Sequence, residues 1–386
     1  MPISNTTVVR FPDIETRMVP FAFLAAILPF SVQAYDVSDD WFVGATTTGV
    51  VQQGEFSGTD IDDTARATLV TDIGINYQPT DRDEFDLVVS FAFGDSLSKV
   101  SPYATHTPYA DDLADALEDI NGRRDYLLTA WYRRTFALGE DISLALTGGI
   151  IDSTGYIDDN AFANDEVSQF MNDAFVNDTL MKPPSYDAGI VAELDIADNW
   201  LVEDASWSVR SVWMNTKNVG GGLDGGDETY NYYATQLGLH TQTGNYRLLA
   251  QYTTDEFLDP EEEDTEELMY FGFSADKKIT DIIGVFSRVS WQDNDAAIAH
   301  DTLYSGGFNI DGSLWGRADD EIGIAYAHLD GGNTEIDRTD ITEGYVKFQL
   351  TKSTDLTLDL QYMDEDATDA DGPYGFIYGI RASAYF

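Results

Sequence analysis

Cysteine is absent from the 386-residue sequence, and histidine occurs only four times. The absence of cysteine excludes disulfides, thiolate metal sites and thiol nucleophiles, and it suits an exported protein that needs no disulfide. No two histidines are four residues apart, as a zinc-binding helix requires, and no Gly-x-Ser-x-Gly motif of serine hydrolases occurs. We therefore expect no enzyme, no cofactor and no bound metal.

Positive charge is also scarce. Lysine and arginine total 21 against 69 aspartates and glutamates, which gives a formal net charge of -48. Binding to nucleic acid requires a basic surface that neutralises phosphates, so we expect no nucleic-acid partner. Two interpretations of the acidity stay open: a solvated surface, and a pore mouth that repels anions.

Long apolar runs are missing except near the N-terminus. The run Met18–Ala34 is shorter than the roughly 20 residues of a membrane helix and contains two prolines. Arg10 and Arg17 precede it, and Val32-Gln33-Ala34 is a small-residue cleavage site. We predict that residues 1–34 are a cleaved signal peptide; an N-terminal anchoring helix is the alternative. A membrane protein with a mean hydropathy of -0.25 has to be a β-barrel, because only half of each strand faces lipid.

Strict alternation of apolar and polar residues runs through the rest of the chain. In Tyr374–Phe386, every second residue from Ala384 back to Tyr374 is apolar, with aromatic residues near both ends. We predict an all-β fold in which residues 35–386 form an antiparallel transmembrane barrel of about 16 strands. The predicted strands are 41–51, 65–77, 85–94, 124–136, 142–151, 186–194, 207–215, 230–241, 246–254, 267–276, 283–293, 301–312, 321–329, 341–350, 356–364 and 374–386.

The lengths of the links support the same fold. Short turns alternate with long, acidic links, so every long link falls on one side of the barrel, and an even strand number closes it. A large soluble β-sandwich, the alternative, predicts no such alternation. The same parity places a set of charged residues on the inner face: Arg66, Arg210, Arg247, Arg288, Lys347, Arg381, Asp72, Asp86, Glu343 and Asp359. These residues either orient polar solutes in the lumen or form ion pairs between neighbouring strands, and both interpretations stay open.

The longest segment without alternation is 152–185, between two predicted strands. We predict that it folds into the barrel and narrows the lumen; a cap on the outside, or a contact with a neighbouring protomer, is the alternative. Its apolar residues around 161–163 and 170–171 suggest a short helix. The candidate constriction residues are Asp158, Asn160, Asn164, Asp165, Glu166, Gln169 and Phe170. The asparagines of the segment suit sugar hydroxyls as neutral donors and acceptors.

One motif in this segment resembles a known family. Asp158–Phe170 matches the Asp-x-Asn-Ala-x-Ala-Asn-Asp-Glu-x-x-Gln-Phe core of the carbohydrate-selective porins (OprB-like) of Gram-negative outer membranes. The blocks Gly312–Tyr326 and Glu343–Leu350 also resemble the same family, although their motifs are less specific. The resemblance implies a 16-stranded barrel in the outer membrane through which sugars and similar small polar solutes diffuse.

The expected partners follow from this reading. They are the solutes, the lipid of the outer membrane, and the barrel-assembly machinery, which would recognise the C-terminal strand. The loops, such as Asp259–Asp264, are more acidic than the family pattern leads us to expect, and this leaves the identity of the solute open. A structural or adhesive barrel whose acidic loops bind cations is the alternative function.

Overall fold

The structure, a computed structural model, describes residues 35–38, 40–95, 97–104, 107–111, 123–184, 186–197, 202, 204–217, 229–254, 257–261, 263–368 and 372–386. Residues 31–386 form one compact unit. The predicted signal peptide, residues 1–34, lies outside the described residues. Among those that are described, no helix is both long and apolar enough to cross a membrane.

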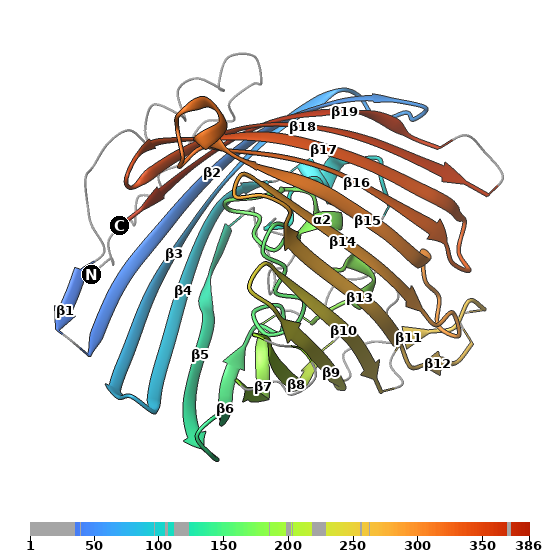
Figure 1. Cartoon of the computed structure of the whole chain (residues 1–386). Coiled ribbons are helices and arrows are strands. Elements are labelled where there is room, and N and C mark those ends of the chain that lie inside the picture. Colours follow the sequence, from blue (N-terminus) through green and yellow to red (C-terminus); the bar gives the residue numbers. More distant parts are fainter. Residues whose placement is uncertain are drawn as a thin grey trace, which may run out of the picture. The chain divides into compact units, whose positions relative to one another are not determined.

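Sixteen antiparallel strands close into a barrel (Figure 1), which confirms the predicted fold and strand number. The last strand pairs with the first long one, from Tyr374 opposite Ser57 to Tyr385 opposite Thr46, so the sheet has no free edge there. The strands of the barrel are β2 (Trp41–Ser57), β3 (Thr64–Thr80), β4 (Asp83–Asp95), β5 (Arg123–Ala137), β6 (Ile142–Ile151), β7 (Asp187–Ile196), β8 (Ser206–Lys217), β9 (Thr229–His240), β10 (Gly244–Thr253), β13 (Met269–Lys278), β14 (Ile283–Gln292), β15 (His300–Asp311), β16 (Glu321–Gly331), β17 (Ile336–Thr351), β18 (Thr354–Ala367) and β19 (Tyr374–Tyr385).

Three short strands and several strand extensions add to the predicted set. β1 (Tyr35–Ser38) pairs with the start of β2, and β11 (Phe257–Leu258) pairs with β12 (Thr265–Glu266) in the link between β10 and β13. β17 begins five residues before the predicted Ile341, at Ile336. The reason is that backbone pairing continues where the outward side chains turn polar, as at Arg338 opposite Asp366, so the apolar pattern underestimates strand length.

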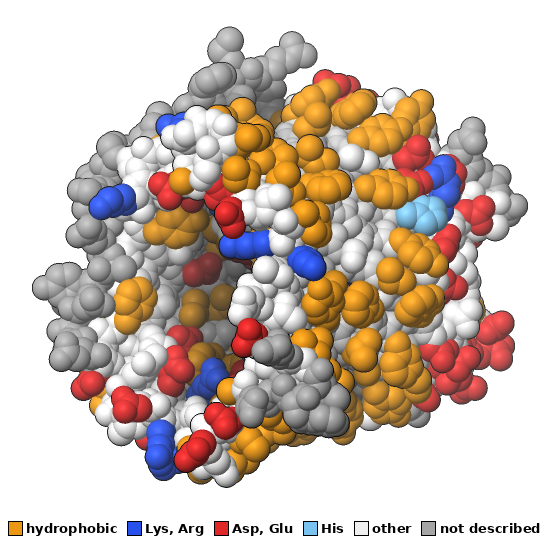
Figure 2. Space-filling model, in the orientation of Figure 1, with side chains coloured by type: hydrophobic (Ala, Val, Ile, Leu, Met, Phe, Trp, Pro, Cys, Tyr) orange, Lys and Arg blue, Asp and Glu red, His pale blue; other side chains and the backbone are white. Residues whose placement is uncertain are grey.

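The two faces of the barrel wall differ sharply in chemistry. Large apolar side chains such as Leu248, Phe271 and Trp291 are exposed on the outer face, where hydrophobic side chains gather over the wall in Figure 2. The alternate residues, such as Gln236, Ser274 and Ser290, are buried and polar. Because the side chains of a strand alternate between faces, the outside of the barrel is apolar and its interior is polar.

The interior holds the link between β6 and β7, residues 152–186, which we call the inward loop. It contains the helix α2 (Asp173–Val176) and the 3-10 turn η3 (Thr179–Met181); η1 (Leu97–Val100) and η4 (Gly312–Trp315) lie in other links. The expected helix at 161–171 was wrong, because side chains there compete for the backbone donors: Asp165 accepts from Val167 N at 2.8 Å. The helix starts instead after Asn172, whose side chain caps it by accepting from Ala174 N.

Candidate functional site: a loop folded into the barrel

The first anchor of the inward loop is a buried ion pair with the barrel wall. Asp158 and Arg288 of β14 are both fully buried, and Asp158 Oδ2 lies 2.6 Å from Arg288 Nε. The same guanidinium donates to the backbone carbonyls of Phe175, at 3.0 Å, and Ala163. A buried charge is tolerated only when it is paired and hydrogen-bonded, so this arginine ties three points of the loop to one place on the wall.

A second anchor lies at the neighbouring carboxylate. Asp159 accepts from Arg247 Nε at 2.6 Å and from Arg210 Nη1 at 2.7 Å. Burial alone would raise the pKa of Asp159, but the two guanidinium groups hold it below its ordinary value. Arg247 is buried, whereas Arg210 is one-fifth exposed and also lies 3.5 Å from Glu193 of β7. Arg210 therefore links the loop to the inner wall while it keeps contact with the lumen.

The second half of the loop is held by another part of the wall, the strands β17 and β19. Glu343 of β17 accepts from the backbone N–H groups of Met171, at 2.6 Å, and Asn172, at 3.0 Å. Arg381 of β19 donates to the carbonyls of Glu166 and, at 2.9 Å, Gln169. Loop and wall thus satisfy each other's buried polar groups on both sides of the lumen, which keeps an irregular backbone ordered inside the barrel.

Apolar packing supplements these polar anchors. Phe170 is buried, and its ring centroid lies 5.0 Å from that of Tyr345, 5.3 Å from that of Phe175 and 5.7 Å from that of Phe286. Burial of one such ring contributes roughly 1.5–3 kcal/mol. Asn160 is also buried and donates to Ser274 Oγ at 3.2 Å, so its amide is engaged by the wall.

A second inward segment, residues 97–104 and 107–111 between β4 and β5, was missed by the sequence reasoning. The carbonyl of Pro108 accepts from Gln52 at 2.9 Å and from Gln361 at 2.8 Å, two residues of the inner wall. This segment pairs with the inward loop through Ala110 N to Met171 O at 2.8 Å. The signal available in the sequence was weak, because the apolar residues of this link, such as the fully buried Leu97 and Tyr109, follow no regular period.

The predicted charged residues of the inner face fall into two groups. Arg247, Arg288, Arg381 and Glu343 are at most 1% exposed and face the loop, which separates them from the open lumen. Arg210 also contacts the loop, at Asp159, but is one-fifth exposed. The others are held by the wall. Arg66 donates to Thr64 and Ala65 of its own strand at 2.9 Å, and Lys347 lies 4.0 Å from Glu321 of the neighbouring strand. Asp86 accepts from Asn76 at 3.4 Å, and Asp359 accepts from Gln361 at 3.0 Å. Asp72 lies on the same face of β3 as Arg66.

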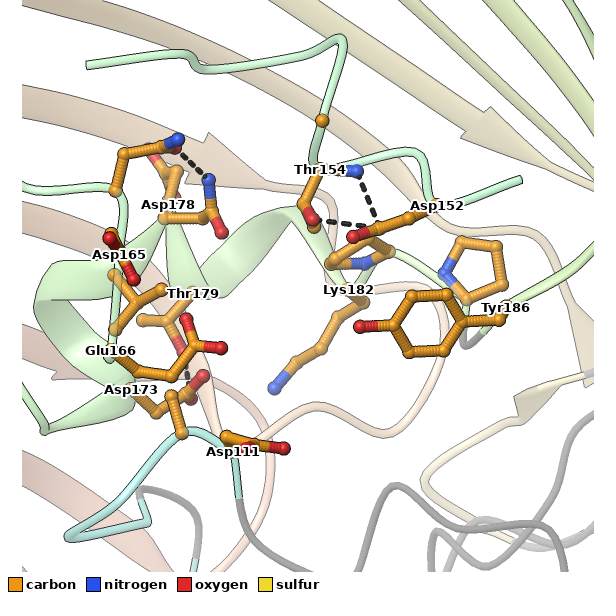
Figure 3. A pocket seen from close by; sticks show the side chains of 17 residues that line it. Asp111, Asp152, Thr154, Asp165, Glu166, Asp173, Asp178, Thr179, Lys182 and Tyr186 are labelled. Atoms are coloured by element: carbon orange, nitrogen blue, oxygen red, sulfur yellow. Dashed lines mark hydrogen bonds between the residues drawn. The ribbon is translucent and has the colours of Figure 1, made fainter. Parts of the chain in front are cut away.

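A cavity of about 480 Å³ lies against the inward loop (Figure 3). Three predicted constriction residues, Asn164, Asp165 and Glu166, line it, together with Asp111 of the second inward segment. Gln169 is not among its lining residues; its side chain braces the loop, donating to Ala161 O at 3.0 Å and accepting from Asn164 N at 2.8 Å. Lys182, which the sequence reasoning did not select, projects between these carboxylates and the opposite side of the cavity. The structure therefore separates buried anchor residues from residues that a solute can reach.

Comparison with known proteins adds a family and a fold. The family model of the carbohydrate-selective porins, OprB family, matches residues 84–382. A protein of Aquifex aeolicus (strain VF5), described only as uncharacterized, is 28% identical over 288 residues, which cover 73% of this chain and 79% of that protein. The high-pH structure of Pseudomonas putida OprB superposes with a TM-score of 0.68 at 16% identity, covering 90% of this chain and 94% of that one. Its low-pH structure gives a TM-score of 0.55 at 15% identity, covering 90% and 93%. Likeness at such identity concerns the fold alone.

Proposed function

This chain belongs to the OprB family of carbohydrate-selective porins, and we propose that its inward loop sets the size of the solutes that pass. The barrel is a porin for the diffusion of sugars, and porins are channels rather than enzymes. The observation that supports the loop's role is its anchoring at two well-separated parts of the wall, at Arg210 of β8 and at Arg381 of β19, which lie near opposite positions in the closed strand order. A segment held across the lumen in this way leaves less room for solutes than the barrel wall alone would leave.

Within this proposal the charged residues have different tasks. Arg247, Arg288, Arg381 and Glu343 position the loop, because they are buried beneath it. Solute meets the accessible polar groups: Arg210 and the cavity residues Asn164 and Glu166. Directed hydrogen bonds from such groups replace part of the hydration of a sugar, and the resulting contacts are weak enough to let it leave.

The location of the barrel in the outer membrane follows from the family, and its export and assembly are proposals. Porins of this family are outer-membrane proteins, and the exposed apolar outer face suits lipid. We infer that residues 1–34 direct export and are removed, and that the barrel-assembly machinery recognises the strand β19. The adhesive alternative receives no support from the family or the fold.

Replacing Asp158–Phe170 with a short Gly/Ser link tests the narrowing role. We expect higher single-channel conductance in planar bilayers and faster entry of larger sugars into liposomes, because the link cannot reach both walls. Heat-modifiable migration on gels would first establish that the variant barrel is folded. An intact barrel with unchanged conductance would place the narrowest point elsewhere.

A further inference from the structure

The anchors of the inward loop leave one arc of the barrel wall uncovered. They lie on β8 at Arg210, on β14 at Arg288, on β17 at Glu343 and on β19 at Arg381. In the closed strand order, β3–β7 lie between β19 and β8 on the side that carries none of these four anchors. The inner face of this arc is therefore the part of the wall that the loop leaves open to a solute.

Arg133, on the inner face of β5, differs from the arginines beneath the loop. Arg288 and Arg381 are at most 1% exposed and donate to carbonyls of the loop. The side chain of Arg133 is 31% exposed, and in the described part of the chain it makes one ion pair, with Glu193 Oε2 at 3.2 Å. Glu193 also lies 3.5 Å from Arg210 Nε and is itself buried, so it holds Arg133 in place from the side of the wall. Most of the N–H donors of Arg133 are thus left for a molecule in the lumen.

Trp131 lies two residues from Arg133 on the same face of β5. The intervening Tyr132 contacts Phe85 on the lipid side, with ring centroids 4.7 Å apart, so the alternation of the strand turns Trp131 inward. Opposite Trp131 on β6 stands Gly149, where an added Cβ would come within 2.6 Å of the Cα of Trp131. The partner residue on β6 thus places no side chain beside the indole, and Trp131 is half-buried, so part of its side chain stays accessible.

A carboxylate lies on the other side of the indole. Asp86 of β4 stands opposite Trp131 in the register and is half-buried. It accepts from Asn76 and from Thr129 at 3.4 Å each, and because both bonds are long, Asp86 can accept a shorter one from a donor in the lumen. A pyranose ring has the matching chemistry. Its apolar face of C–H groups is attracted by the negative face of indole, and its hydroxyls accept from a guanidinium and donate to a carboxylate.

We propose that solutes pass between the inward loop and the arc β3–β7, and that Trp131, Arg133 and Asp86 form a subsite there for a pyranose ring. Trp131 is the platform, Arg133 the donor and Asp86 the acceptor, while Glu193 positions Arg133. The inference rests on the proposed function, because a sugar reaches this wall only by entering the barrel. The subsite adds chemical selectivity to the size limit, since it favours a ring with an apolar face over an open-chain polyol of similar size.

Glucose and sorbitol provide the test, because they are nearly equal in size and sorbitol has no ring. In planar bilayers, we expect glucose to block half of the single-channel current at about one-fifth of the sorbitol concentration, a ratio equivalent to ~1 kcal/mol, as for one aromatic contact. Equal half-blocking concentrations would overturn the proposal, and so would a wild-type current that neither solute blocks. Entry of glucose into liposomes is measured in parallel. If glucose enters in either case, the porin function stands; if no sugar enters, the proposed function fails as well.

Variants that form a folded, heat-modifiable barrel identify the groups responsible. Trp131→Leu keeps an apolar side chain without an aromatic face and should bring glucose to the level of sorbitol, whereas Trp131→Phe should stay near wild type. Arg133→Gln should raise the half-blocking concentration of both solutes about fivefold, and Arg133→Lys should not restore it, because an ammonium lacks the planar fork.

Lys347→Gln is the matched control, because it removes a positive charge from the inner face of β17, outside the arc, and should change nothing. The size limit for larger sugars should stay that of wild type in all of these variants, since the anchors of the loop are intact. Equal effects of Lys347→Gln and Arg133→Gln, or a Trp131→Leu channel that still prefers glucose to sorbitol, would contradict the subsite.

Discussion

Replacing Arg288 with methionine should release one side of the inward loop and widen the pore. Arg288 is fully buried and holds the loop at Asp158 Oδ2, 2.6 Å away, and at the carbonyls of Phe175 and Ala163. Methionine keeps an unbranched apolar stem but supplies no donor. The variant therefore leaves a carboxylate and two carbonyls without their partner, while the backbone pairing of β14 is unaffected.

The size of the effect follows from the burial of the pair. Removing one partner of a buried ion pair costs about 3–5 kcal/mol, because the other charge stays uncompensated. At about 1.4 kcal/mol for each factor of ten, the docked loop should lose at least about two orders of magnitude relative to the undocked loop. Adding Asp158→Asn should recover much of this cost, because a neutral amide replaces the stranded charge.

Single-channel recording and sugar uptake measure the outcome. Arg288→Met should give higher and noisier conductance and admit larger sugars, and the double variant should lie between it and wild type. Lys347→Met is the matched control, because it also removes a positive charge from the inner face. The ammonium of Lys347 lies 4.0 Å from Glu321 and does not hold the loop. The loss of this ion pair should cost about 1 kcal/mol or less. A folded Arg288→Met barrel with the conductance and size limit of wild type would refute the reasoning.

Three further predictions follow from other parts of the chain. Phe386→Asp should lower the yield of folded, heat-modifiable barrel, because a carboxylate replaces an apolar ring where the chain closes on β2 beside Ala45, and about 1 kcal/mol or more of apolar contact is lost; wild-type yield would oppose this. Reversal potentials in a KCl gradient should show modest cation selectivity near 0.01 M, because the field of the acidic loops reaches across a Debye length of about 30 Å. Near 1 M the Debye length is about 3 Å, and little selectivity should remain. Anion selectivity at low salt would mean that the inner arginines dominate. Burial, with the nearby Asp158, raises the pKa of Asp178 to about 6, while Arg288 and Tyr270 also face it. Because the pKa of Asp178 in the folded protein exceeds its ordinary value of 3.8, docking of the loop should weaken as pH rises through about 4 to 6. Protease cleavage of the loop should then be faster at about pH 7.5 than at pH 5. Asp178→Asn should remove that difference.

The strands could be predicted from the sequence because each one exposes its outer face to the same apolar surroundings. Leu248, Phe271 and Trp291 illustrate this: each is a large apolar residue followed at the next position by one that faces the interior. Turn residues and the lengths of the links then fixed the number of strands. The ends of β17 were less visible, since pairing continues through polar residues such as Arg338.

The interior was harder to predict, because inward-folded links have no repeating pattern. The length of 152–185 and its lack of alternation predicted an inward loop, but the polar residues of the motif Asp158–Phe170 gave no hint of which would be buried. Asp158 and Asn160 became anchors, whereas Asn164 stayed accessible, and that difference depends on partners far away in the sequence. Lys182 gave no signal in the sequence, since it lines a cavity that residues of two links form together.

The central claim is that this barrel is a passive pathway for sugars whose size limit the inward loop sets. Swelling of liposomes that contain the purified, folded protein tests this most directly, with isoosmotic glucose, a disaccharide and a trisaccharide as solutes. The account predicts that glucose makes these liposomes swell much faster than protein-free liposomes. The swelling rate should fall steeply as the sugar becomes larger, and no energy source or cofactor should be needed. Swelling no faster than in protein-free liposomes, by a barrel shown to be folded, would contradict it.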